Sequence, residues 1–185
     1  MPSFSIRPLT PGDAAAYRAL RLAGIAELPA GFCTTLAAES AVPLAQMAQR
    51  LHATAHQIMF GTFADAQLTG IAGLRREPIA VVHDKASLWG VYVAPAARGH
   101  GAGRQLVQAA LAHACGIPEL ARVRLAVAQD NRAALTLYLG CGFVLADASA
   151  SDGMLQMQCV LPRPAIATTP NNVFLKINTL QFLAK

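Results

Sequence analysis

The 185-residue sequence has little charge, few aromatic residues and no long hydrophobic run, and each shortage narrows the class of protein. Charged residues make up 14% and aromatic residues 6% of the chain, against 54% hydrophobic residues and a mean hydropathy of +0.39. This balance argues against disorder over most of the length. No hydrophobic run approaches the roughly 18–20 residues of a membrane-spanning helix, and the N-terminus has no apolar signal core. We therefore expect a cytoplasmic protein with no membrane partner.

Metal-binding and disulfide patterns are also missing. The sequence has four cysteines: Cys33, Cys115, Cys141 and Cys159. None is in a CxxC pair, and none has a histidine at metal-ligand spacing. We expect reduced thiols and no metal site.

The positive charge is concentrated at the C-terminus. The formal net charge is +5, but residues 163–185 hold three basic residues and no acid, which leaves +2 on the rest of the chain. A weakly basic domain favours a small polyanionic ligand over nucleic acid. We therefore expect no nucleic-acid partner. The alternative, a nucleic-acid-binding module, would show itself by a strong dependence of binding on salt concentration.

Hydrophobic periodicity predicts the element order β-α-α-β-β-β-α-β-α-β-β. Strands are expected at 3–9, 57–63, 67–75, 86–93, 121–128, 143–147 and 154–161, and helices at 10–27, 43–53, 101–115 and 131–139. Residues 28–40 are expected to be irregular. Hairpins combined with βαβ crossovers predict an α/β fold with a mixed, partly antiparallel central sheet flanked by helices. We expect one domain over 1–162. The apolar extension 163–185 is expected to dock on it or on a partner subunit, as in a homodimer.

The segment 98–104, RGHGAGR, directly follows an apolar strand and opens a helix. Its glycines let successive N–H groups point at one spot, and the helix start adds unsatisfied donors and the positive end of its dipole. The segment therefore predicts a cradle for phosphate or pyrophosphate, to which Arg98 and Arg104 add charge-assisted contacts.

Two common phosphate-binding motifs do not fit this loop. A P-loop is excluded because no Gly-Lys-Ser/Thr occurs. The dinucleotide fingerprint is excluded because Arg104 stands where its third glycine belongs, and the acid expected about 20 residues further on is missing.

A second motif, NRAALTLYLGCGF, spans residues 131–143. Together the two motifs resemble the GNAT superfamily of N-acetyltransferases. RGHGAG is similar to that family's Arg/Gln-x-x-Gly-x-Gly/Ala acetyl-CoA loop, and residues 131–143 match its N-x-x-A-x-x-L-Y-x-x-x-G-F pattern. The expected element order over 3–161 agrees with the family fold, whereas the last 23 residues lie outside the resemblance. The resemblance implies a GNAT-like fold and acetyl-CoA as cosubstrate.

The resemblance also implies roles for individual residues. The backbone of Val91, Tyr92 and Val93 would pair with the pantetheine arm and polarise the thioester carbonyl. The pyrophosphate would be held by the loop: Arg98, Gly99, His100, Gly101, Ala102, Gly103 and Arg104. Asn131 would contact the cofactor, cap the last helix, or both, with Asp130 as the alternative cap. A bulge at Trp89-Gly90 would splay this strand from 122–128.

The implied reaction is acetyl transfer to a primary amine by direct attack. Tyr138 is the implied general acid for the departing thiolate; the alternative is a core aromatic. Cys141 is a conceivable covalent nucleophile, although its Gly-Cys-Gly setting also suits small-residue packing. A second functional interpretation is a non-catalytic, regulatory domain that binds acyl-CoA.

The general base and the amine acceptor stay open. Residues that could line the acceptor side as bases are Glu27, Glu39, His83 and Asp84, each of which is also an ordinary solvated residue. His100 is expected to face solvent or phosphate, and His113 to favour the negative end of its helix. Residues 28–40 and 148–153 are expected to shape the acceptor site. The apolar character of 28–40 favours a small or apolar amine over a polyamine, and peptide and lysine amines stay open.

Overall fold

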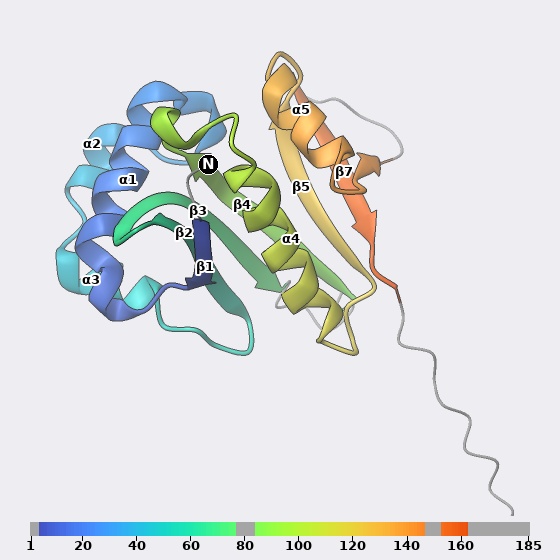
Figure 1. Cartoon of the computed structure of the whole chain (residues 1–185), viewed down its shortest axis with the longest axis horizontal. Helices are drawn as coiled ribbons and strands as arrows, with labels where there is room; N and C mark the ends of the chain where they lie inside the picture. Colours follow the sequence, from blue (N-terminus) through green and yellow to red (C-terminus); the bar gives the residue numbers. More distant parts are fainter. Residues whose placement is uncertain (1–3, 77–83, 147–152, 163–185) are drawn as a thin grey trace, which may run out of the picture.

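The computed structural model describes residues 4–76, 84–146 and 153–162 and shows one seven-stranded sheet with helices on both faces (Figure 1). The strands are β1 (Phe4–Pro8), β2 (Gln57–Ala64), β3 (Gln67–Arg76), β4 (Lys85–Val93), β5 (Arg122–Ala128), β6 (Val144–Leu145) and β7 (Met154–Val160). Their order in the sheet is β1-β2-β3-β4-β5-β7-β6. Only the pair β4–β5 is parallel among the described strands, so the sheet is mixed, as predicted.

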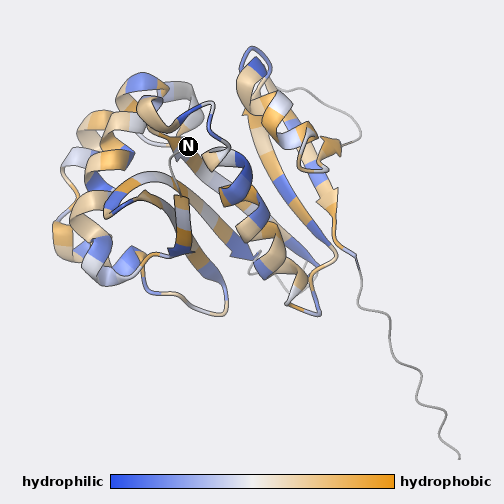
Figure 2. Cartoon of the chain, in the orientation of Figure 1, coloured by the Kyte–Doolittle hydropathy of each residue, from blue (hydrophilic) through white to orange (hydrophobic). Residues whose placement is uncertain are grey.

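The helices divide between the two faces of the sheet. They are α1 (Ala14–Glu27), α2 (Leu36–Ser40), α3 (Leu44–Arg50), α4 (Ala102–Cys115) and α5 (Arg132–Leu139). α4 packs on one face over a core that includes Leu88, Leu106 and Val123. α1 and α3 cover the other face at the β1–β4 half of the sheet, over a second core that includes Tyr17 and Ile71 (Figure 1). The strands alternate hydrophobic and polar residues where one face is less covered, most clearly in β5 (Figure 2).

α2 is the one helix that the sequence did not predict, because residues 28–40 were expected to be irregular. It is five residues long, too short for a periodic pattern. Its start is fixed by the Thr35 hydroxyl, which accepts a hydrogen bond from the Ala38 N–H at 3.2 Å. Glu39 then ties it to α1 and α3 through ion pairs with Arg21 (2.6 Å) and Arg50 (2.8 Å). Tertiary contacts thus stabilise a helix that its own sequence barely signals.

β4 and β5 separate from each other partway along their length. Their pairing joins Lys85–Ser87 to Arg122–Arg124 and, among the described residues, goes no further. Beyond that point the two strands diverge (Figure 1). The divergence accompanies a β-bulge: Ile71 pairs with Tyr92 and Gly73 with Trp89, so that two β4 residues stand opposite one β3 residue. The predicted bulge at Trp89-Gly90 is therefore confirmed.

The bulge depends on Gly90 and places two aromatic side chains on the same face of the sheet. Gly90 has a φ of 59°, which a residue with a side chain rarely adopts. The extra residue also shifts the alternation of side chains, so Trp89 and Tyr92 both pack on the α1 side of the sheet. A single glycine thus opens the sheet and sets which side chains border the opening.

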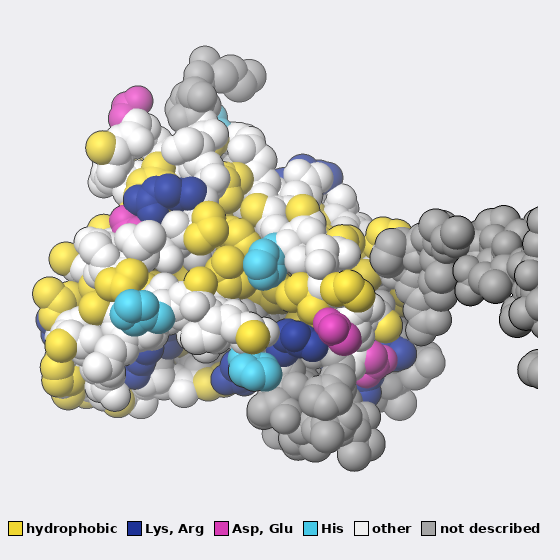
Figure 3. Space-filling model, turned by 90° about the horizontal axis from the view of Figure 1, so that it is seen from below, with side chains coloured by type: hydrophobic (Ala, Val, Ile, Leu, Met, Phe, Trp, Pro, Cys, Tyr) yellow, Lys and Arg dark blue, Asp and Glu magenta, His cyan; other side chains and the backbone are white. Residues whose placement is uncertain are grey.

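The face of the molecule seen in Figure 3 shows no single dominant chemistry. In Figure 3, Lys and Arg side chains form separate small groups among hydrophobic and uncharged ones. Within the described ranges, no helix has the length and hydrophobicity needed to cross a bilayer. The predicted docking of 163–185 on the domain or on a partner subunit falls outside the described residues, as do the candidate base His83 and most of the expected acceptor loop 148–153.

Candidate functional site

Two adjoining cavities flank the point where β4 and β5 separate. The first, of about 640 Å³, lies between Leu88–Val91 and Leu125–Ala128 and reaches the start of α5. The second, of about 570 Å³, lies on the α1 side of the same strands. Both are lined by Leu88, Trp89, Gly90, Leu125 and Ala126. The cavities therefore meet where the sheet opens.

The backbone of the glycine-rich loop turns sharply at the start of α4. Gly99 and Gly101 have φ angles of 76° and 84°, and Gly101 is the N-cap of α4. A Cβ placed on Gly99 would meet nothing within 4 Å, so the space in front of the loop is open. The first hydrogen bond of the helix runs from the Gln105 N–H to the Gly101 carbonyl at 3.1 Å, which leaves the preceding N–H groups as free donors.

Gly103 serves packing rather than backbone conformation. A Cβ there would lie 3.3 Å from Leu137 of α5 and 3.6 Å from Val93 of β4. The missing side chain lets α4 approach both elements closely. The predicted loop residues thus divide into two groups: Gly99 and Gly101 shape the cradle, and Gly103 holds α4 in place.

The side chain of Arg98 is bound within the protein. Its guanidinium makes two hydrogen bonds to the Glu27 carboxylate, at 2.7 and 2.8 Å, and its Nε donates to the Val93 carbonyl at 2.9 Å. The Tyr92 hydroxyl donates to the same carboxylate at 2.8 Å. Arg98 therefore fastens the loop to the end of α1.

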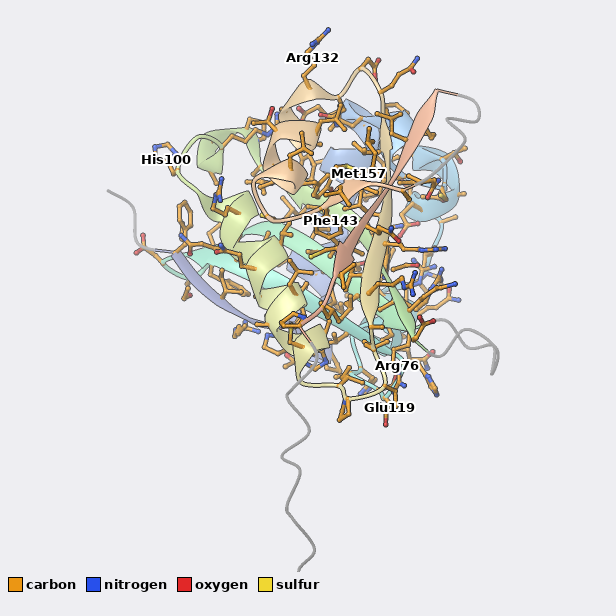
Figure 4. All side chains as sticks on the ribbon, turned by 90° about the vertical axis from the view of Figure 1, so that its right-hand side faces the viewer. Arg76, His100, Glu119, Arg132, Phe143 and Met157 are labelled. Carbon is orange, nitrogen blue, oxygen red and sulfur yellow. The ribbon has the colours of Figure 1, made fainter. Side chains whose placement is uncertain are left out.

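Arg104 and His100 also differ from simple phosphate ligands. Arg104 Nη1 donates to the Gly140 carbonyl at 2.8 Å and so closes the end of α5. His100 is exposed, with Nδ1 2.7 Å from the Arg98 carbonyl. It lies with Arg132 at one end of the molecule, while Arg76 and Glu119 mark the other end (Figure 4). The charge-assisted contacts of Arg98 and Arg104 with an anion stay predictions; in this structure both side chains make hydrogen bonds within the protein.

Asn131 and Tyr138, at the start of α5 and within it, both line the first cavity. Asn131 caps the helix: its Oδ1 accepts from the Ala134 N–H at 3.1 Å. Tyr138 is only 7% exposed, and its ring packs at 5.8 Å from that of Phe143. Burial raises the pKa of Tyr138 to about 12, with a smaller contribution from Cys141. The phenol therefore stays protonated at neutral pH.

Most of the proposed bases are not placed to act. Glu39 is 3% exposed, is held between two arginines and lines neither cavity. Asp84 pairs with Arg122 at 3.2 Å and also lines neither cavity. Asp84, at 40% side-chain exposure, fits the alternative of an ordinary solvated residue, whereas Glu39 is buried and fits neither interpretation. Sequence proximity to the site does not show where a side chain is held.

Glu27 does line the first cavity, but it is already an ion-pair partner. Hydrogen bonds from Arg98 and Tyr92 lower the pKa of its carboxyl, against the opposing effect of burial. A carboxylate so stabilised is a weak proton acceptor.

Cys141, the conceivable nucleophile, and His113 both lie in settings that suit packing rather than catalysis. Cys141 lines neither cavity, and burial raises the pKa of its thiol, which disfavours the reactive thiolate. His113 packs edge-on against Phe60 at 5.7 Å. Within the described ranges, no group of three His, Cys, Asp or Glu side chains is arranged as metal ligands would be.

Three arginines that line the second cavity, Arg21, Arg75 and Arg124, were not predicted as site residues from the sequence. The alternation of side chains along the predicted strands was the available signal for Arg75 and Arg124, since residues two apart share a face. Arg21 gave no such signal, because it lies on a helix whose partner strands are distant in sequence.

Comparison with known families identifies the architecture. Residues 25–143 match the model of the acetyltransferase (GNAT) family. No curated protein sequence matches the chain significantly.

Solved structures share the fold at low sequence identity. A GNAT-family acetyltransferase from Streptococcus pneumoniae superposes with a TM-score of 0.73 at 22% identity, over 86% of this chain and 100% of its own. The PaiA N-acetyltransferase of Thermoplasma acidophilum, in complex with coenzyme A, gives 0.67 at 21% identity, over 85% and 99%. YncA, a putative acetyltransferase from Salmonella typhimurium with its cofactor acetyl-CoA, gives 0.70 at 20% identity, over 88% and 96%.

Proposed function

The chain belongs to the GNAT family of acetyltransferases, and from this premise we propose that it transfers an acetyl group from acetyl-CoA to a primary amine by direct attack. The observation that carries the proposal is the opening between β4 and β5, with a cavity that extends from the bulge at Gly90 to the start of α5. Structural relatives that contain coenzyme A or acetyl-CoA support the choice of cosubstrate.

The cosubstrate supplies the thioester, and this chain supplies its binding surface. Past Ser87 the β5-facing edge of β4 lacks a strand partner among the described residues. The backbone N–H and C=O groups of Val91–Val93 are proposed to pair with the amide groups of the pantetheine arm, as an added strand would. The N–H groups at the start of α4 are proposed to hold the pyrophosphate. Asn131 borders the same cavity and orients α5 beside it.

Tyr138 is proposed to donate a hydrogen bond to the departing sulfur. A thiol has an ordinary pKa of about 8.5, far below the value of about 12 for this phenol. Full proton transfer from Tyr138 to a thiolate is therefore uphill, whereas a hydrogen bond from a phenol that stays protonated costs nothing at neutral pH. The half-buried position of Cys141 away from both cavities supports direct attack over a covalent enzyme intermediate.

The alternative, a regulatory domain that binds acyl-CoA without turnover, predicts the same binding. It is favoured by the occupied or remote positions of the carboxylates considered as bases. A solvent-exposed water chain can serve as the proton acceptor in its place, so we retain the enzymatic function as the proposal. Release of free coenzyme A in the presence of an amine distinguishes the two.

The test is calorimetric titration of the full chain with acetyl-CoA, together with Gly101→Glu. The substitution forces a side chain onto a φ of 84°, which costs roughly 1–2 kcal/mol, and adds a negative charge in front of the anion site. We expect at least about tenfold weaker binding.

Gly12→Glu is the matched control, because it adds the same side chain at an exposed position at the start of the segment leading into α1. It should bind acetyl-CoA like the parent protein. A folded parent protein that fails to bind acetyl-CoA would remove the proposed function, and equal losses in both variants would remove the assignment of the loop.

A further inference from the structure

We infer that the acceptor amine carries a carboxylate, which binds in the second cavity against Arg21, Arg75 and Arg124. This deepens the proposed function and rests on it. The expected substrate is a small amino acid or a related amine with an anionic group a few atoms from the nitrogen. Three arginines and no Asp or Glu line this cavity among the described residues.

Strand register places two of the arginines on one face of the sheet. Arg75 of β3 pairs with Ser87 of β4, and Ser87 pairs with Arg124 of β5. Directly paired residues on neighbouring strands project to the same face of the sheet. Their neighbours Leu74 and Val123 belong to the core under α4, so Arg75 and Arg124 project to the α1 side, where the second cavity lies.

The environment of Arg21 leaves positive charge uncompensated under this surface. Its side chain is 9% exposed, and its Nε donates to Glu39. The same Glu39 oxygen accepts from Arg50, so one carboxylate serves two guanidinium groups. Arg21 Nη1 is buried and has no hydrogen-bond partner among the described residues. A buried charged donor without an acceptor is costly, and a bound carboxylate would satisfy it.

The unsatisfied group lies at the junction of the two cavities. Arg21 Nη1 is 3.5 Å from the position that a Cβ on Gly90 would occupy, and Gly90 lines both cavities. A carboxylate held there would leave the amine of a small substrate close to the opening between β4 and β5. Guanidinium groups bind carboxylates with two parallel hydrogen bonds, which suits this chemistry better than a neutral or cationic tail.

Size and charge together exclude a polyamine. A volume of about 570 Å³ lies in the range typical of small-molecule sites, roughly 300–1,000 Å³. Arg75 and Arg124 form no ion pair with a described residue. The second ammonium group of a polyamine would therefore lie beside positive charge that no described carboxylate balances. The expected acceptor is therefore a small amine that also carries an anionic group.

The experiment compares acceptors that differ only in charge. The full chain is assayed for coenzyme A release with the proteinogenic amino acids, their carboxamides and matched aminoalkylphosphonates. We expect kcat/KM for the best amino acid to exceed that of its carboxamide by about 10–100-fold, because the hydrogen bonds of a guanidinium to a carboxylate are stronger than those to a neutral amide. A phosphonate that outperforms the carboxylate would overturn the choice of carboxylate.

Variants then locate the effect. Arg124→Gln should raise KM for the amino acid about tenfold or more, with little change in kcat or in KM for the carboxamide. Arg122→Gln is the matched control: it lies on the same strand, pairs with Asp84 and lines neither cavity. Equal behaviour of the two variants, or equal use of amino acids and carboxamides, overturns the inference.

A readout without turnover separates this inference from the proposed function. N-acetylated amino acids and their amides are titrated into the protein in the absence of acetyl-CoA. Selective binding of the carboxylate forms, lost in Arg124→Gln, supports the anion site even for a protein that does not release coenzyme A. Acetyl-CoA binding with no preference for carboxylates leaves the proposed function standing and overturns the inference.

Discussion

Tyr138→Phe is expected to lower kcat for acetyl transfer by about 10²–10³-fold, the range typical of losing one hydrogen-bond donor to a developing negative charge. The substitution removes only the phenolic oxygen, so the ring should keep its packing against Phe143 at 5.8 Å. Acetyl-CoA affinity, measured by calorimetry, should change by less than about twofold, because a donor that acts in the transition state contributes little to ground-state binding.

The pH dependence of kcat gives a second measure of the same proposal. Burial raises the pKa of Tyr138 to about 12, so the phenol remains the protonated donor throughout the neutral and moderately alkaline range. Activity should therefore show no falling limb from Tyr138 below about pH 11. A limb near pH 10 that disappears in Tyr138→Phe would contradict the buried, protonated donor described here.

Tyr17→Phe is the matched control for Tyr138→Phe. Tyr17 of α1 is fully buried in the core between that helix and the sheet, and it lines neither cavity. Removing its hydroxyl should leave kcat unchanged. If both variants lose activity equally, the effect is a general consequence of disturbing the core, and Tyr138 has no special role.

The elements and the conformation of the glycine-rich loop could be predicted from the sequence because their signals are local. Glycines at 99 and 101 directly ahead of an amphipathic helix specify the positive φ angles that the structure shows. Gly90 in the middle of an apolar strand indicated the bulge, which strand register confirms. In each case a single residue type is required by a backbone conformation, so neighbouring residues alone carry the information.

The side-chain partners could not be predicted because they join segments distant in sequence. Arg98 was expected at the anion site but binds Glu27, 71 residues away. Glu39 was considered as a base but lies between two arginines from other helices. A residue's charge and its position along the chain do not reveal which of several partners will bind it once the helices pack. The arginine surface of the second cavity likewise required the register of three strands.

Glu39→Ala is expected to destabilise the fold by about 3–5 kcal/mol, the cost of breaking a buried ion pair by removing one partner. The carboxylate is 3% exposed, and its removal leaves Arg21 buried with no counterion and detaches α2 from α1 and α3. Thermal unfolding should show the loss as a decrease in Tm of roughly 6–20 °C. Glu119→Ala is the matched control: its side chain is 60% exposed and lies 3.6 Å from Arg76, so it should cost less than about 1 kcal/mol.

The same residue sets an expected pH dependence of stability. Burial alone would raise the pKa of Glu39, but the hydrogen bonds and charges of Arg21 and Arg50 outweigh it, and the pKa falls below its ordinary value of 4.5. A carboxyl whose pKa is lower in the folded than in the unfolded protein binds fewer protons when folded. Its stabilising contribution is therefore complete above about pH 5 and is lost as the pH falls through the lowered pKa. The free energy of unfolding of the parent protein should decrease more steeply with acidification below pH 4.5 than that of Glu39→Gln, and parallel curves for the two proteins would show that Glu39 is not held as an anion between the arginines.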